Sequence, residues 1–217
     1  MTSRIGLFGG TFNPVHLAHL RAAEEVREQC ALDRVEFVLS AVPPHKTSVE
    51  LASVEHRRRM LELALTGNSA FTVNASEVER PGRSYSIDTI RASQADAPTA
   101  RFTFVLGTDA FAEIETWKEF PEIFALCDVC VISRPGVTVT QPPIALENAF
   151  CYDAGRRVYA HRSGYSLAFL PVTALMISAS DIRQRCATGR SIRYLVPATV
   201  ESHIREHRLY TGRAPAP

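Results

Sequence analysis

The stretch of sequence that decides the fold lies near the amino terminus and reads Arg4-Ile-Gly-Leu-Phe-Gly-Gly-Thr-Phe-Asn-Pro-Val-His-Leu-Ala-His19. Its first half is a short apolar run that ends in Gly9-Gly10, a pattern typical of one buried strand followed by a loop. Asn13-Pro14 is a turn or helix-start signal, and an amphipathic pattern then runs from Leu17 to about Cys30. The stretch therefore predicts a strand, a glycine loop and a helix, in that order.

The glycine loop and the helix start together have the features of a phosphate site. Glycines lack a Cβ, so backbone N–H groups can close on an anion, and the helix start adds a partial positive charge. His16 and His19 stand three residues apart and can point at the same ligand. The alternative is an ordinary turn with two surface histidines. The stretch lacks the Gly-Lys-Ser/Thr ending of a P-loop and the third glycine of a dinucleotide fingerprint.

The rest of the chain alternates between strand and helix patterns. Strands are expected at 35–39, 71–73, 101–107, 128–132 and 167–172, and helices at 54–65, 87–95, from 121, at 177–189 and at 197–207. Glu77–Glu79 is expected to continue the strand at 71–73, and Ser86 to cap the helix that follows it. The order predicts an α/β fold with a doubly wound parallel sheet. One domain is expected, with an irregular lobe at about 135–165 and a small helical part at about 179–210.

Ligands of such sheets bind beyond the carboxyl ends of the strands. The loops after Phe8, Leu39, Gly107, Ile132 and Val172 should therefore line one crevice, and the candidate motifs lie on these loops.

Composition excludes several classes of protein. The chain has 217 residues, 46% hydrophobic and 22% charged, which is ordinary for a soluble globular domain. Its formal charge of +1 gives no reason to expect nucleic acid or a membrane surface as a partner. No apolar run approaches the length of a membrane span, and the first strand leaves no room for a signal peptide. A cytoplasmic location is expected.

Several other patterns have ordinary structural interpretations. The five cysteines do not form a disulfide framework, and Cys127-x-x-Cys130 is expected to be a pair of buried, inert thiols. Arg57-Arg58-Arg59 is interpreted as the solvated face of a helix, although such residues can also border an anion site. His203 and His207 lack the glutamate of a zinc-protease helix and are interpreted as surface residues.

Four further residues have a ligand-binding and a structural interpretation. Arg183 follows capping serines near a helix start, where a cation is unfavourable unless an anion lies between them. Lys46 is either a phosphate-binding cation or a surface lysine. Asp109 either accepts from ribose hydroxyls or caps a short helix. Trp117 either stacks on a planar ring or belongs to the core or its rim.

Taken in this order, the motifs resemble the bacterial nicotinate-nucleotide adenylyltransferase family over nearly the whole chain. The matching stretches are Gly6-Leu-Phe-Gly-Gly-Thr-Phe-Asn-Pro-Val-His16, Val42-Pro-Pro-His-Lys46, Ser84-Tyr85, Gly107-Thr-Asp109, Thr116-Trp117, Ser133-Arg-Pro-Gly136, Ile177-Ser-Ala-Ser-Asp-Ile-Arg183 and Leu195-Val-Pro197. The first and the Ile-Ser-x-x-x-Ile-Arg stretches mark the nucleotidyltransferase superfamily with its His-x-x-His signature. The Pro-Pro-His-Lys, Thr-Trp and Arg-Pro-Gly stretches are specific to the nicotinate branch.

The resemblance implies a Rossmann-like nucleotidyltransferase fold and a reaction in NAD biosynthesis. ATP and nicotinate mononucleotide would give deamido-NAD and pyrophosphate by in-line attack on the α-phosphorus, without an enzyme nucleophile. It implies that Mg²⁺ enters with ATP, and it assigns no metal-ligating side chain. It implies ATP-binding roles for Gly9, Gly10, Thr11, Phe12, His16, His19, Gly107, Asp109, Ile177, Ser178, Ser180 and Arg183, mononucleotide-binding roles for His45, Lys46, Ser84, Tyr85, Trp117 and Arg134, and catalytic roles for His16, His19 and Arg183.

The chain departs from the family pattern at two places. Ala18 replaces the usual glycine before the second histidine, and Ser40-Ala41 replaces a polar position before Pro-Pro-His-Lys. The alternatives are another transferase of the superfamily, for example one that acts on phosphopantetheine, or an ATP-binding module without turnover. The sequence leaves nicotinate against nicotinamide preference open, and also whether the chain forms a homo-oligomer.

Overall fold

The computed structural model describes residues 2–41, 51–80, 82, 84–133 and 140–212. Its strands are β1 Arg4–Gly10, β2 Arg34–Leu39, β3 Phe71–Asn74, β4 Arg101–Gly107, β5 Asp128–Ser133, β6 Phe150–Asp153, β7 Val158–His161 and β8 Ser166–Pro171. Its helices are α1 Leu17–Gln29, α2 Val54–Leu65, α3 Ser76–Glu79, α4 Ser86–Asp96, α5 Thr108–Ala112, α6 Phe120–Leu126, α7 Ala179–Ala187 and α8 Ala198–Glu206, with 3₁₀ turns η2 Ile114–Thr116 and η3 Ile144–Ala149.

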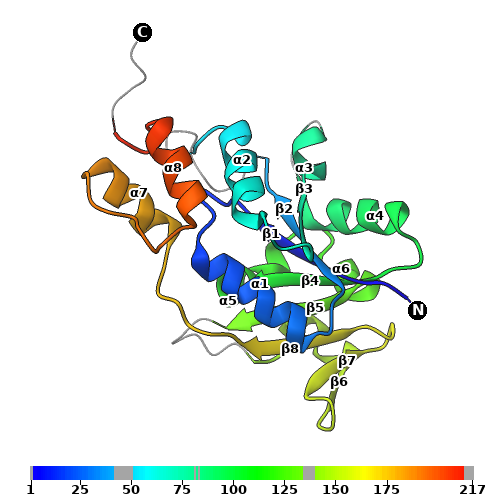
Figure 1. Ribbon diagram of the computed structural model, residues 1–217. Helices are drawn as coiled ribbons and strands as arrows, with labels where there is room; N and C mark the ends of the chain where they lie inside the picture. Colours follow the sequence, from blue (N-terminus) through cyan, green and yellow to red (C-terminus); the bar gives the residue numbers. More distant parts are fainter. Residues whose placement is uncertain (1, 42–50, 81, 83, 134–139, 213–217) are drawn as a thin grey trace.

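In the part of the chain that is described, all eight strands form one sheet in the order β3-β2-β1-β4-β5-β8-β7-β6. The pairings from β3 to β8 are parallel, which confirms the doubly wound arrangement. The chain starts at the central strand β1, winds outward to β3 and returns to β4 on the other side of β1. The carboxyl ends of β1 and β4 thus lie side by side where the winding reverses (Figure 1). Ligands of open α/β sheets bind at this kind of position.

Alternating side chains of the strands build one hydrophobic core on each face of the sheet. Phe8 of β1 and Phe37 of β2 pack with α1, α2, α7 and α8 on the first face. Ile5 and Leu7 of β1 pack with α4, α5 and α6 on the second. Because both faces are covered, the central strands are apolar along almost their whole length. This is why they were recognisable in the sequence. No helix in the described residues is both long and apolar enough to span a membrane.

A regular hairpin lies where the sequence predicted an irregular lobe. The strands β6 and β7 pair antiparallel, and β7 pairs antiparallel with β8, so the hairpin extends the sheet. The Asp153 carboxylate closes the turn by accepting from the backbone N–H groups of Gly155 and Arg156, at 3.0 and 3.1 Å. The sequence prediction missed β6 because this edge strand is largely solvent-exposed and lacks a hydrophobic pattern.

Two other local predictions were also wrong. Glu77–Glu79 lies in the short helix α3 rather than in a continuation of β3. The strand ends because the Asn74 side chain accepts from the Ser76 N–H at 3.0 Å, which turns the chain. Ser86 is the first residue of α4, and the capping position belongs to Tyr85. The helices α7 and α8 lie within the part that was predicted to be helical.

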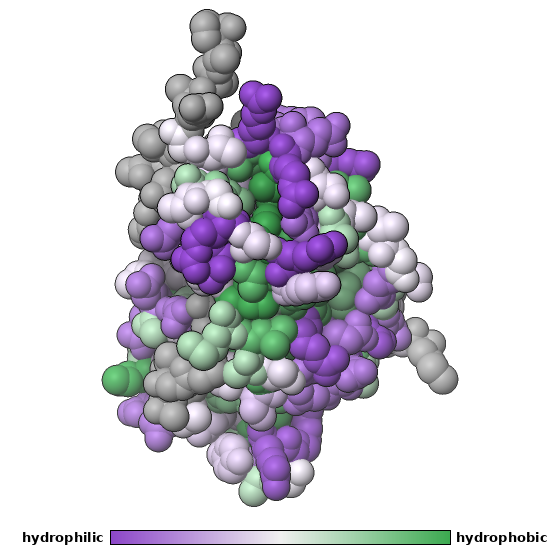
Figure 2. Space-filling model, turned by 60° about the vertical axis from the view of Figure 1, so that its left-hand side comes forward, coloured by the Kyte–Doolittle hydropathy of each residue, from purple (hydrophilic) through white to green (hydrophobic). Residues whose placement is uncertain are grey.

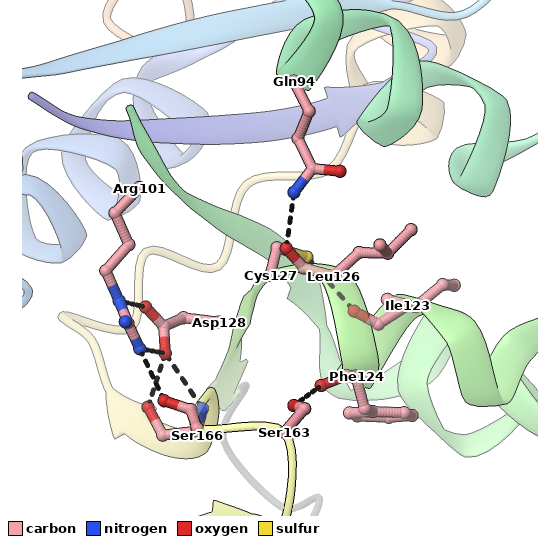
Figure 3. Close-up of polar contacts among 10 residues, drawn as sticks. Gln94, Arg101, Ile123, Phe124, Leu126, Cys127, Asp128, Ser163 and Ser166 are labelled. Carbon is pink, nitrogen blue, oxygen red and sulfur yellow. Dashed lines mark hydrogen bonds and ion pairs between the residues drawn. The ribbon is translucent and has the colours of Figure 1, made fainter. Parts of the chain in front are cut away.

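A buried carboxylate ties three strands together at the amino ends of β4 and β5, away from the carboxyl edge (Figure 3). Asp128 Oδ1 accepts from Arg101 Nη2 at 2.8 Å and from both the N–H and the hydroxyl of Ser166 at 2.9 Å. The same Arg101 nitrogen also donates to the Gly164 carbonyl at 3.1 Å. These bonds hold β4, β5 and β8 in register, so they act on stability.

We expect Asp128→Ala to destabilise the protein by roughly 2–3 kcal/mol, since it leaves Arg101 and Ser166 without their acceptor. The expected loss of stability is no larger because the Arg101 side chain is 37% exposed and water screens its charge. Urea unfolding measures the loss. Arg205→Ala removes an ion pair with Glu201 at 2.7 Å, in which the arginine is 79% exposed, and is the control, with less than about 0.5 kcal/mol expected. An equal loss in both variants would contradict this role for Asp128.

Candidate active site

The loop after β1 positions the two histidines of the His-x-x-His stretch as a stacked pair. His16 is the N-cap of α1 and is 4% exposed. Its backbone N–H donates to Nδ1 of His19 at 3.3 Å. The two rings stack with centroids 3.6 Å apart and an interplanar angle of 23°. The structure thus confirms that both imidazoles share one face at the helix start.

The same hydrogen bond sets the tautomer of His19. An imidazole nitrogen that accepts a hydrogen bond carries no proton, so the ring N–H of a neutral His19 lies on Nε2. Phe8 and Phe12 contact the His19 ring at centroid distances of 6.3 and 5.2 Å and fix its orientation. A rigid N–H donor at a helix start is the arrangement that stabilises charge developing on a phosphate oxygen.

The two glycines of the loop have different structural requirements. A Cβ on Gly10 would lie 2.7 Å from the Phe12 ring, so Gly10 is needed for packing of the loop itself. A Cβ on Gly9, or on Gly107 at the end of β4, would meet no atom of the described residues within 4 Å. Because β1 and β4 are neighbours, the two glycines lie at adjacent strand ends. Among the described residues, the space beyond both strand ends is therefore open. Figure 2 turns this edge of the sheet toward the viewer and shows hydrophobic surface between hydrophilic side chains.

Asn13 connects the loop to the C-terminal helices. Its backbone carbonyl accepts from Nη1 of Arg183 at 2.9 Å. Its side-chain oxygen accepts from the Tyr210 hydroxyl at 2.7 Å and from the Ala52 N–H at 3.1 Å. Arg183 therefore contacts the histidine loop directly. Sequence reasoning missed Asn13 and Tyr210, because an asparagine before proline indicates only a turn.

Arg57 was wrongly interpreted as part of a solvated helix face, since it is 1% exposed. Its guanidinium donates to the carbonyls of Thr11 at 3.0 Å, Ser40 at 2.6 Å, Ala41 at 2.8 Å and Ala52 at 3.1 Å. Burial lowers the pKa of Arg57 from its ordinary value. Arg57 joins the glycine loop, the end of β2 and the start of α2. Arg58 and Arg59 are exposed as expected, and nothing in a run of three arginines distinguishes the first.

We expect Arg57→Met to destabilise the protein by about 3 kcal/mol, because the four carbonyls lose a charged donor in a buried place. The glycine loop should loosen at the same time and weaken nucleotide binding. Arg58→Met is the matched control on the solvent side of α2 and should stay within about 0.5 kcal/mol of the parent. Thermal unfolding of the two variants in parallel measures the difference, and similar midpoints would refute the role assigned to Arg57.

Of the predicted mononucleotide-binding residues, Ser84, Tyr85 and Trp117 lie in the described part of the chain, and Trp117 packs against the second-face core. Tyr85 is 36% exposed, and the ammonium of Lys118 lies 4.8 Å from its ring centroid. Trp117 is half-buried, with its ring edge-on to Phe104 at 6.2 Å. The hydroxyl of Ser84 donates to the Glu77 carbonyl at 3.2 Å. The structure thus brings Tyr85 close to the Trp117-Lys118 stretch. His45, Lys46 and Arg134 lie outside the described residues.

The remaining predicted ATP-binding residues lie at the starts of two helices beyond the sheet. Asp109 is exposed in the first turn of α5, whose capping position is Gly107, so Asp109 is not the cap. Ser178 caps α7 by accepting from the Asp181 N–H at 3.2 Å. Ser180 is exposed beside it, with the two hydroxyl oxygens 3.1 Å apart. Ile177 is partly buried and packs against the first-face core.

Comparison with known proteins places this arrangement in a family. Residues 7–185 match the cytidylyltransferase-like family. Proteins of Geotalea uraniireducens and Geobacter sulfurreducens, both named as probable nicotinate-nucleotide adenylyltransferases, are each 47% identical over 95% of this chain and 98% of their own. The fold is similar to that of Plasmodium falciparum nicotinic acid mononucleotide adenylyltransferase, solved with NaAD (TM-score 0.73) and with APC (0.71), at 16% identity over 97% of this chain and 98% of that one. The chain therefore belongs to the cytidylyltransferase-like family and, within it, to the nicotinate-nucleotide adenylyltransferases.

Proposed function

We propose that the protein joins ATP and nicotinate mononucleotide to give deamido-NAD and pyrophosphate, in NAD biosynthesis. The observation that carries the proposal is the stacked pair of His16 and His19 at the start of α1, with Arg183 bonded to the same loop. The names of the 47% identical relatives support the substrates. The open space beyond Gly9 and Gly107 supports a nucleotide site at this edge of the sheet.

In this proposal catalysis is positioning and charge stabilisation. The mononucleotide phosphate attacks the α-phosphorus in line, the bond to the β-phosphate bridging oxygen breaks, and pyrophosphate leaves with that oxygen. His16 and His19 donate to phosphate oxygens whose negative charge grows in the transition state. Their fixed stacking means that little reorganisation is needed when that charge develops.

Arg183 and the exposed Ser180 bind the departing pyrophosphate in this account, because a guanidinium forms forked hydrogen bonds to phosphate. Gly9, Gly10 and Thr11 approach the phosphates through the backbone, and Gly107 and Asp109 hold the adenosine ribose. Mg²⁺ enters as part of Mg–ATP. The groups that the protein supplies around the loop are mostly N–H and O–H donors, which suit phosphate oxygens and leave the ion to the nucleotide.

The mononucleotide lies, in this proposal, against the second face. Tyr85 and Trp117 frame the pyridine ring, and Ser84 lies beside them. The ammonium of Lys118 lies against the Tyr85 ring and is paired with the Asp88 carboxylate at 3.1 Å, so it holds the Tyr85 ring in place. His45, Lys46 and Arg134 would complete the set.

The test is product identification by chromatography and mass spectrometry after incubation with Mg–ATP and nicotinate mononucleotide. Deamido-NAD and pyrophosphate should form in equal amounts. Because no enzyme nucleophile takes part, radiolabelled pyrophosphate should not exchange into ATP when the mononucleotide is left out. Exchange under that condition would contradict direct transfer, and a lack of dinucleotide would contradict the proposed function.

A further inference from the structure

Three histidines converge outside the active site, between the helices α2 and α8. His56 lies in the first turn of α2, His203 lies in α8, and His207 is the C-cap of α8. Nδ1 of His56 and Nε2 of His203 are 3.1 Å apart. The interpretation of His203 as a surface residue was wrong, because it is 8% exposed. The cluster could not be recognised in the sequence, because its third member, His56, stands 147 residues before His203.

The three rings form a closed set rather than a chain. The ring centroids are 5.3 Å apart for His56 and His203, 4.9 Å for His56 and His207, and 4.4 Å for His203 and His207. One nitrogen of each ring lies within 4.8 Å of the corresponding nitrogen in the other two. Ligand nitrogens of a tetrahedral Zn²⁺ site are about 3.3 Å apart, given Zn–N bonds of 2.0–2.1 Å. Nδ1 of His56 and Nε2 of His203, at 3.1 Å, are already near that spacing.

The backbone holds these three positions firmly. His203 and His207 are four residues apart and therefore share one face of α8. The helices α2 and α8 pack side by side (Figure 1). The Thr199 hydroxyl of α8 also donates to the Leu63 carbonyl of α2 at 3.2 Å. Because both helices contribute to the first-face core, the ligand positions exist before any ion binds.

The surroundings fit a metal ion with an open fourth position. A surface hollow of about 580 Å³ adjoins the cluster and is lined by Arg59, Ser202 and Glu206 among others. Burial, followed by the neighbouring His207 and His56, lowers the pKa of His203 from its ordinary value. Arg59 lines the hollow, and its guanidinium pairs with the Glu62 carboxylate at 3.2 Å.

We propose that His56, His203 and His207 bind one borderline divalent ion of the Zn²⁺ class. Three imidazoles favour Zn²⁺, Co²⁺, Ni²⁺ or Cu²⁺ over Mg²⁺ and Ca²⁺, which prefer oxygen ligands. The ion would cross-link α2 to α8. The ion would also hold His56, which directly precedes Arg57 in the chain. The Arg57 guanidinium in turn supports the glycine loop. The site is separate from the proposed reaction, which uses none of these three histidines.

The experiment uses untagged, chelator-treated protein without nucleotide, titrated with Zn²⁺ by calorimetry and with Co²⁺ by visible absorption. We expect one ion per chain and the intense visible bands of a four-coordinate Co²⁺ site. Zn²⁺ should also raise the unfolding temperature, since it binds the folded state. His207→Ala and His56→Ala should each weaken binding by about 100-fold or more, because two imidazoles remain. Ser202 lines the same hollow but has no imidazole, so Ser202→Ala is the control and should bind Zn²⁺ as the parent does.

Two results would overturn the proposal. Unchanged stoichiometry and affinity in His207→Ala would show that the ion binds elsewhere, for example at His16 and His19. An absence of binding at millimolar Zn²⁺ would show that the cluster is only a packed set of rings. His207 is exposed, so its replacement should fold normally, and circular dichroism checks this. With Mg–ATP as substrate, adenylyl transfer by the Zn²⁺-free His207→Ala variant should equal that of the Zn²⁺-free parent, which separates this test from the test of the proposed function.

Discussion

Replacing His19 with alanine should lower turnover at saturating substrates by about 100-fold or more, while the Kd for ATP changes by less than about threefold. The imidazole is held by its contacts with His16 and Phe12 before substrate binds. A donor placed in advance acts mainly on charge that develops in the transition state. Steady-state pyrophosphate release gives kcat, and calorimetry with a non-hydrolysable ATP analogue gives the affinity.

The variant also loses the hydrogen bond from the His16 N–H, which costs about 1 kcal/mol of helix capping. Unfolding must therefore be measured alongside the rate. His207→Ala is the control. It removes an imidazole from the separate cluster between α2 and α8 and should keep its turnover. Parallel losses of ATP affinity and kcat in His19→Ala would contradict a transition-state role.

Gly9→Val should abolish ATP binding with little change in stability. Gly9 is exposed at the end of β1, and its added Cβ would meet nothing within 4 Å in the part of the chain that the structure describes. Valine suits a strand, so the unfolding temperature should stay within about 3 °C of the parent. The branched side chain should instead occupy the space that a phosphate or ribose needs, raising the Kd for ATP by about 100-fold or more.

Gly10→Ala separates the two glycines. Its Cβ would lie 2.7 Å from Phe12, so this variant should lose stability and binding together. If Gly9→Val binds ATP as tightly as the parent does, the nucleotide does not approach the end of β1. That result would contradict the proposed nucleotide site beyond Gly9.

The central strands and the histidine loop could be predicted from the sequence because each is specified locally. A strand such as Arg101–Gly107 is buried on both faces and reads as a continuous apolar run. The loop after β1 combines glycines, a proline and two histidines within a few residues, and every one of these constrains the backbone or the chemistry. The substrate was predicted from the resemblance, through the Pro-Pro-His-Lys, Thr-Trp and Arg-Pro-Gly stretches.

What the sequence did not predict depends on long-range contacts. Arg57 cannot be distinguished from Arg58 until α2 is packed against the glycine loop, since only then do four carbonyls surround its guanidinium. Asn13 matters because Tyr210 reaches it from the other end of the chain. The histidine cluster likewise exists only because α8 returns to α2.

The measurement that tests the account most directly is pyrophosphate release with Mg–ATP and a panel of acceptors. The panel holds nicotinate mononucleotide, nicotinamide mononucleotide and phosphopantetheine. We predict the highest kcat/KM with nicotinate mononucleotide, with deamido-NAD as the product. Activity with phosphopantetheine alone would keep the phosphate chemistry of His16 and His19 but contradict the roles of Tyr85 and Trp117. Lack of pyrophosphate release with all three acceptors would contradict the proposed function itself.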